Sequence, residues 1–110
     1  MWMPSKENSV VVDSKITDYL LNLEHQIGGS KAKFFMRFGF KLESLENFRF
    51  ALKQHAINRN VASSNNTGFG MKYELICEIE TPDTRNPCIT TIWIINNDED
   101  SPRLVTAFPS

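Results

Sequence analysis

Hydrophobic and polar positions change their spacing once along this chain, near Met71. Before that point apolar residues recur every three to four positions, which is the rhythm of helices that bury one face. After it apolar and polar residues alternate, which is the rhythm of strands with one buried face. This order predicts an α+β fold, with N-terminal helices packed on one face of a C-terminal antiparallel β-meander of three to four strands.

Three helices are predicted in the first half of the chain. The first spans residues 15 to 22 after a cap at Asp13 or Ser14. Its apolar stripe consists of Ile16, Tyr19, Leu20 and Leu23. The second is capped by Ser30 and ends at Gly39, with an apolar face of Phe34, Phe35 and Phe38. The third spans residues 44 to 58 and carries a stripe made of Leu45, Phe48, Leu52 and Ala56.

The strands are predicted from the second half. The β-branched triplet at residues 10 to 12 adds a short strand, whereas residues 58 to 70 are rich in Asn, Ser and Gly and predict a flexible loop. A strand from Met71 places Tyr73, Leu75, Cys77 and Ile79 on one face. A turn at residues 81 to 87 leads into a strand at residues 88 to 95, and a third strand follows at residues 103 to 108.

Length and composition favour one domain. A chain of 110 residues with 41% hydrophobic residues can bury a single core, so we expect a flexible N-terminus at residues 1 to 9 and one α+β domain at residues 10 to 110. No secretory signal or apolar run long enough to cross a membrane is visible, and the cytoplasm is the expected compartment.

Charge and cysteine content exclude few classes of function. The formal net charge is −1, so composition provides no overall attraction to nucleic acid or membrane. The first 60 residues are mildly basic, which is typical of solvated helix surfaces. Cys77 and Cys88 flank the predicted turn and could face each other across a hairpin, but we expect buried free thiols.

Few residues offer chemistry. The run Gly28-Gly29-Ser30-Lys31 resembles a fragment of a phosphate-binding loop, although the full pattern is absent and a capped helix start explains it equally well. His25 and His55 are the only histidines and the natural candidates for proton transfer. Neither has the spacing of a metal ligand, so no metal or cofactor is expected.

The last predicted strand carries two further polar candidates. Arg103 and Thr106 are three positions apart and should point to opposite faces of the sheet unless a bulge intervenes. Because this strand is short and ends at Pro109, it predicts a sheet edge at which a homodimer would form by strand pairing.

Several segments together resemble a family of small bacterial domains of unknown function, over about residues 10 to 108. In the first half these segments are residues 15 to 22, His25 with Glu24, residues 28 to 35, and residues 38 to 40. In the second half they are residues 70 to 73, 91 to 95 and 102 to 108.

This resemblance implies a relation to toxin modules of the barnase, colicin and RelE type of ribonuclease. In such enzymes Lys, His, Arg and Thr side chains on the open face of the sheet cleave RNA through its own 2′-hydroxyl. Lys31, Arg103 and Thr106 match marked positions of the family, whereas Ser30 stands where the family commonly has a His.

Two functions therefore remain open. The first is a binding or interaction module of unknown ligand. The second is a metal-independent ribonuclease, in which Lys31 and Arg103 hold phosphate and His25 or His55 transfers protons. Convergence of these side chains with Thr106 on a single cleft would favour the enzyme.

Overall fold

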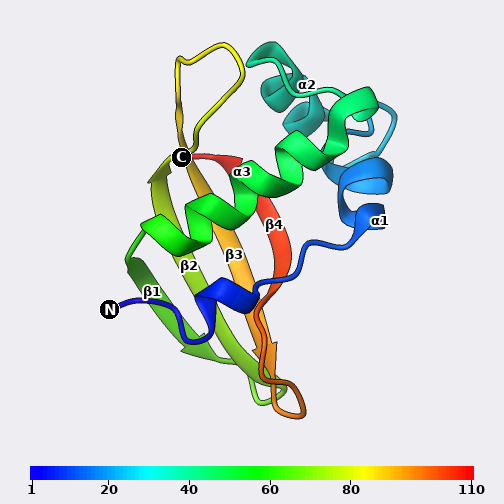
Figure 1. Cartoon of the computed structure of the whole chain (residues 1–110). Coiled ribbons are helices and arrows are strands. Elements are labelled where there is room, and N and C mark those ends of the chain that lie inside the picture. The colour runs from blue at the N-terminus through cyan, green and yellow to red at the C-terminus, as the bar shows by residue number, and fades with distance from the viewer.

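The computed structural model describes residues 1 to 110 as helices followed by one four-stranded antiparallel sheet with strand order β1-β2-β3-β4 (Figure 1). The α-helices are α1 (Asp13–Lys15), α2 (Gly29–Arg37) and α3 (Leu45–Asn58), with short turns η1 (Lys6–Asn8), η2 (Ile16–Leu20) and η3 (Leu42–Ser44). The strands are β1 (Val61–Asn66), β2 (Gly70–Glu78), β3 (Cys88–Asn96) and β4 (Arg103–Pro109). The predicted α+β class and the meander are confirmed.

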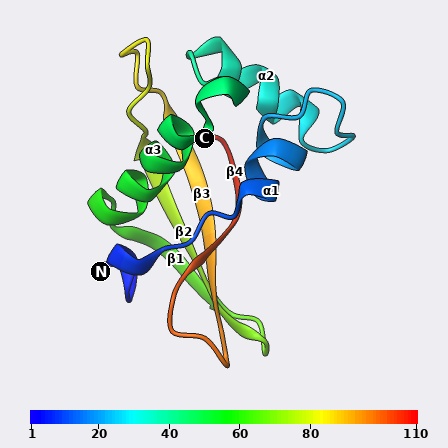
Figure 2. The same ribbon diagram turned by 45° about the vertical axis from the view of Figure 1, so that its right-hand side comes forward.

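The helices lie on one face of the sheet and beyond one of its edges. Helix α3 crosses the front of the sheet, while α1 and α2 lie on the side of β4 (Figures 1 and 2). Phe48, Leu52 and Ala56 of α3 are fully buried, as the helical stripe predicted. Trp93 of β3 is also fully buried, so the core lies between α3 and the centre of the sheet.

The first helix departs from α geometry. After α1 the chain winds as a π turn in η2, where the N–H of Leu21 donates to the carbonyl of Ile16 at 2.8 Å. Ile16, Leu20 and Leu21 are therefore buried, and the prediction that Leu23 completes the stripe is wrong, because its side chain is 53% exposed. Tyr19 is only half-buried and lies at the margin of the core.

The predicted loop at residues 58 to 70 is also corrected, since residues 61 to 66 form β1. Ser63 to Asn66 pair with β2, with a bulge next to Val61. Backbone hydrogen bonds to β2 hold this strand although its side chains beyond Val61 are exposed. The triplet at residues 10 to 12 contributes a single parallel bridge, from Val10 to Arg103 of β4.

Strand β2 has an irregular residue at Cys77. Its neighbours Leu75 and Ile79 are buried, but Cys77 has a φ of 124° and is exposed. The predictions that Cys77 faces the core and that both thiols are buried are therefore wrong, because this left-handed backbone turns the side chain outward. Both cysteines are free thiols, and Cys88 is half-buried.

The first nine residues pack against the domain. Met3 is 2% exposed within the core, and the Lys6 ammonium donates a hydrogen bond of 2.8 Å to the carbonyl of Ile57. The N–H of Val61 donates to the carbonyl of Met1 at 2.7 Å. These contacts attach the segment to the end of α3 and the start of β1.

None of the helices combines the length and the apolar character required to traverse a lipid bilayer.

Candidate functional site

Three polar side chains from distant parts of the sequence meet beside β4. The Lys31 ammonium, from the first turn of α2, donates hydrogen bonds to the Tyr19 hydroxyl and, at 3.0 Å, to the Thr106 hydroxyl. The hydroxyls of Tyr19 and Thr106 are 3.1 Å apart. We call Tyr19, Lys31 and Thr106 the polar triad. Two of the three N–H groups of the Lys31 ammonium are used in these hydrogen bonds.

The electrostatic surroundings lower the pKa of the Tyr19 phenol. Burial alone would raise its pKa, but the hydrogen bonds from Lys31 and Thr106 and the positive charges of Lys31 and Lys15 lower the pKa of Tyr19 below its usual value. The Lys31 ammonium lies 4.8 Å and the Lys15 ammonium 5.5 Å from the centre of the Tyr19 ring. A phenol of lowered pKa releases its proton more readily in acid–base chemistry near neutral pH.

Tyr19 and Thr106 open onto a cleft of about 620 Å³ between the first helical segment and β4. Its other lining residues are Ser14, Lys15, Asp18, His25, Ile27 and Val105. The lining combines three hydroxyls with one ammonium, from Lys15, and one carboxylate, from Asp18, which suits a polar ligand.

His25 reaches the same cleft from the loop before α2. Its ring lies edge-on to Tyr19, with 4.9 Å between the ring centres. Its Nδ1 accepts hydrogen bonds from the backbone N–H groups of Ile27, at 3.0 Å, and Gly28, at 2.8 Å. The proton of the neutral ring is therefore on Nε2, so in this conformation His25 is a hydrogen-bond donor to a ligand.

Gly28 allows α2 to begin against Tyr19. A Cβ at Gly28 would lie 2.5 Å from the carbonyl oxygen of Tyr19 and 2.7 Å from its ring. Gly28 is the residue that precedes α2, and no side chain caps the helix, so the prediction that Ser30 is the cap is wrong. Starting the helix at Gly29 puts Lys31 in its first turn, directly beside the phenol.

A bulge in β4 sets the direction of Thr106. Ile92 pairs with Thr106 and Trp93 pairs with Leu104, which leaves Val105 as an extra residue. Arg103 and Thr106 consequently lie on the same face of the sheet. Without the bulge, their spacing of three would place them on opposite faces. Leu104 is buried below that face, in the core.

Arg103 and His55 lie away from the polar triad. Arg103 forms an ion pair with Glu99, at 3.0 Å, and lines a separate hollow beside Val10. His55 of α3 is 2% exposed, and its Nε2 donates a hydrogen bond of 2.8 Å to the carbonyl of Cys77 in β2. Its Nδ1 accepts from the Thr91 hydroxyl at 2.9 Å. Both ring nitrogens of His55 are thus occupied within the protein.

The structure brings together Lys31, Thr106 and His25 from the predicted candidates and adds Tyr19. In the sequence Tyr19 belongs to the apolar stripe of the first predicted helix, and its one distinguishing signal is a hydroxyl among aliphatic side chains. No cluster of three or more His, Cys, Asp or Glu side chains has the geometry to hold a metal ion.

Comparisons with known proteins give a family and a fold. The model of the family described as domain of unknown function (DUF6883) matches residues 2–110, so the chain belongs to that family. No curated protein matches the chain. A similar solved structure is a chain of a contact-dependent growth inhibition toxin–immunity protein complex from Klebsiella pneumoniae 342, with 18% sequence identity and a TM-score of 0.73. The match covers 96% of this chain and 97% of that chain, and at this identity it shows a shared fold.

Proposed function

We propose that this member of the DUF6883 family is a metal-independent ribonuclease whose proton donor is Tyr19. The observation that carries the proposal is the hydrogen-bonded polar triad, in which Lys31 supports two residues, Tyr19 and Thr106, that line an open cleft. A lowered pKa at a side chain that lines a cleft supports acid–base catalysis by that side chain.

The reaction uses the 2′-hydroxyl of RNA as its nucleophile. The 2′-oxygen attacks the adjacent phosphorus while its proton passes to water, and the bond from phosphorus to the 5′-oxygen breaks. Tyr19 gives its proton to the departing 5′-oxygen and regains one from water. The products are a 2′,3′-cyclic phosphate and a free 5′-hydroxyl.

The other residues of the cleft stabilise charge and orient the phenol. The Lys31 ammonium compensates the charge that develops on the phosphate oxygens and keeps the pKa of Tyr19 low. The Thr106 hydroxyl, 3.1 Å away, helps to hold the hydroxyl of Tyr19 in place. The Nε2 proton of His25 is available to a non-bridging phosphate oxygen. Arg103, on its separate hollow, has no part in this scheme.

The similar fold adds support from a second direction. That structure is described as a complex of a growth inhibition toxin with an immunity protein. Cleavage of cellular RNA is one way in which a protein of this size can inhibit growth, and we extend the proposal to a protein partner that neutralises the domain.

The test is cleavage of total RNA in the presence of excess EDTA. We expect the wild type to produce fragments that end in cyclic phosphate and Tyr19→Phe to lose about 10²–10⁴-fold in rate, because it lacks only the proton donor. The matched control is Tyr73→Phe, which removes a hydroxyl from a buried ring of β2 and should keep full activity. No cleavage by the wild type, or equal cleavage by Tyr19→Phe, would contradict the proposal.

Lys31→Met provides a second readout. We expect it to reduce cleavage and to raise the pKa of Tyr19, because it removes the strongest hydrogen bond and a nearby positive charge. Ultraviolet titration of the phenolate, with Tyr19→Phe as the reference, measures that shift. Lys53→Met, on α3, is the control for loss of a lysine charge away from the cleft.

A further inference from the structure

The two cysteines lie at diagonal positions of neighbouring strands. Cys77 pairs with Ile89 and Glu78 pairs with Cys88, so the cysteines are one step apart across the β2–β3 ladder. Adjacent strands are about 4.8 Å apart and rise about 3.3 Å per residue, which puts diagonal Cα atoms about 6 Å apart. This separation is within the range of disulfide-bonded cysteines.

Ordinary strand geometry would keep the two thiols on opposite faces of the sheet. Alternation places Cys77 on the core side with Leu75, whereas Cys88 belongs to the other side. The positive φ of 124° at Cys77 turns its exposed side chain away from the core and toward the face of Cys88, close enough to raise the pKa of the Cys88 thiol. A β-strand cysteine rarely adopts this backbone, and such departures concentrate at functional positions.

We propose that Cys77 and Cys88 are a redox-active dithiol that closes to an intramolecular disulfide. The co-reactant is a low-molecular-weight disulfide such as oxidised glutathione. The Cys77 thiolate attacks one of its sulfurs, a mixed disulfide forms and one glutathione thiol leaves. The Cys88 thiolate then attacks the Cys77 sulfur and releases the second glutathione. The protein loses two protons and two electrons, and the oxidant becomes two thiols.

Exposure assigns the order of the two steps. Cys77 is exposed and meets the oxidant first, whereas Cys88 is half-buried. Burial and the neighbouring Cys77 thiol raise the pKa of Cys88. A thiol that is poorly ionised in solution is a slow first attacker but serves as the resolving group once a disulfide is held beside it.

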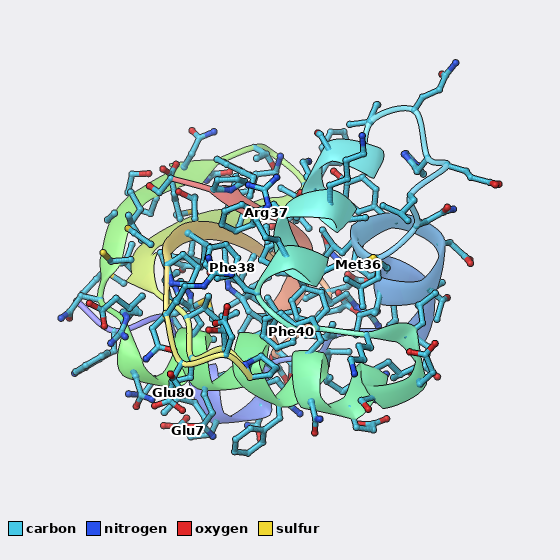
Figure 3. The ribbon with its side chains drawn as sticks, turned by 90° about the horizontal axis from the view of Figure 1, so that it is seen from above. Glu7, Met36, Arg37, Phe38, Phe40 and Glu80 are labelled. Atoms are coloured by element: carbon cyan, nitrogen blue, oxygen red, sulfur yellow. The ribbon has the colours of Figure 1, made fainter.

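The disulfide would close the loop at residues 78 to 87, which is fastened to the end of α2. The Arg85 guanidinium lies 4.4 Å from the centre of the Phe38 ring and donates to the carbonyl of Arg37 at 2.9 Å. The N–H of Asp83 donates to the carbonyl of Phe38 at 3.3 Å. Seen from above, Arg37 and Phe38 lie next to this loop (Figure 3). Oxidation would therefore stiffen the support of the helix that carries Lys31.

The experiment treats the full chain with excess oxidised glutathione at neutral pH and measures intact mass and thiol labelling after unfolding. We expect a monomer that is lighter by two hydrogen atoms, has no reactive thiol, and melts several degrees higher than the reduced protein. Dithiothreitol should restore both thiols. Unreacted thiols, two bound glutathiones or a disulfide-linked dimer would each overturn the proposal.

Serine variants test the order of the steps. Cys88→Ser should accumulate one glutathione on Cys77, because the resolving thiol is missing. Cys77→Ser should acquire glutathione more slowly than Cys88→Ser, because only the half-buried thiol remains. Equal labelling rates in the two variants would contradict the assigned order. None of these readouts depends on ribonuclease activity.

Discussion

At the scale of single residues, the interior contains a series of hydrogen bonds that passes through the buried His55. The Trp93 indole N–H donates to the Thr91 hydroxyl at 2.9 Å, and that hydroxyl donates to Nδ1 of His55. The Nε2–H group of His55 in turn donates a hydrogen bond to the carbonyl of Cys77. Every member has its partner only while the ring is neutral, so His55 has a structural role.

The buried ring of His55 makes the free energy of unfolding depend on pH. Burial, as the largest cause, lowers the pKa of His55 to about 4, against about 6.5 for an unfolded chain. Between these values the unfolded state binds more protons, so stability falls as pH decreases from 6.5 and this group contributes roughly 3 kcal/mol less at pH 4. Denaturant unfolding at a series of pH values should show this loss in the wild type and a flatter profile in His55→Gln.

His25 provides the matched control for that series. Its ring lies in the cleft and not in the core, so His25→Gln should retain the decline in stability between pH 6.5 and 4. If His25→Gln removed the decline and His55→Gln kept it, the structural assignment of the two histidines would be wrong.

At the scale of elements, the join between η2 and α2 builds the site. Gly28→Ala introduces a methyl group where the Tyr19 carbonyl and ring already lie. We expect the ring to move away from Lys31, the pKa of the phenol to rise, and cleavage of RNA to fall by at least about tenfold, since a displaced catalytic group is strongly penalised. Phenolate titration and the cleavage assay measure both effects.

Gly68→Asn is the control for Gly28→Ala. Gly68 has open space around a Cβ and a φ of 86°, which asparagine tolerates better than most residues. Its position in the β1–β2 turn leaves the cleft untouched. Equal loss of activity in the two glycine variants would show that the effect of Gly28→Ala is not local.

Elements with a strong period were predictable, and irregular ones were not. Helix α3 and strands β2 and β3 follow from stripes and alternation that burial enforces over many residues. Strand β1 has no buried face along residues 62 to 66, so it shows no alternation of apolar and polar residues from which a strand could be predicted. The π turn and the Val105 bulge each add one residue to the regular repeat. The residues on either side of each irregularity therefore lie on other faces than a regular repeat predicts.

The candidate site shows the same division. Lys31 stands at a glycine-marked helix start, Thr106 stands at a position that the family resemblance marks, and His25 is one of only two histidines. Tyr19 was hidden, because its place in an apolar stripe predicts burial, whereas the side chain is half-buried and lines the cleft. Arg103 shared a strand with Thr106, but its partner Glu99 became known only with the fold.

At the scale of the whole molecule, the N-terminal segment completes the core. Met3→Ala should lower the free energy of unfolding by about 2–5 kcal/mol, because it leaves a cavity in a packed interior. Met1→Ala is the matched control, since Met1 is 68% exposed and should change stability little. Thermal and denaturant unfolding distinguish them, and equal stability of both variants would contradict the burial of Met3.

The π turn has a consequence for how this domain tolerates changes in length. One turn of π winding holds about one residue more than one turn of α winding, so deletion of Thr17 or Asp18, neither of which lies in the core, would restore regular winding. The phenol would then rotate toward the interior, and the ammonium of Lys31 would face an empty position. We expect such a deletion to keep the fold and to remove the phenol from the cleft.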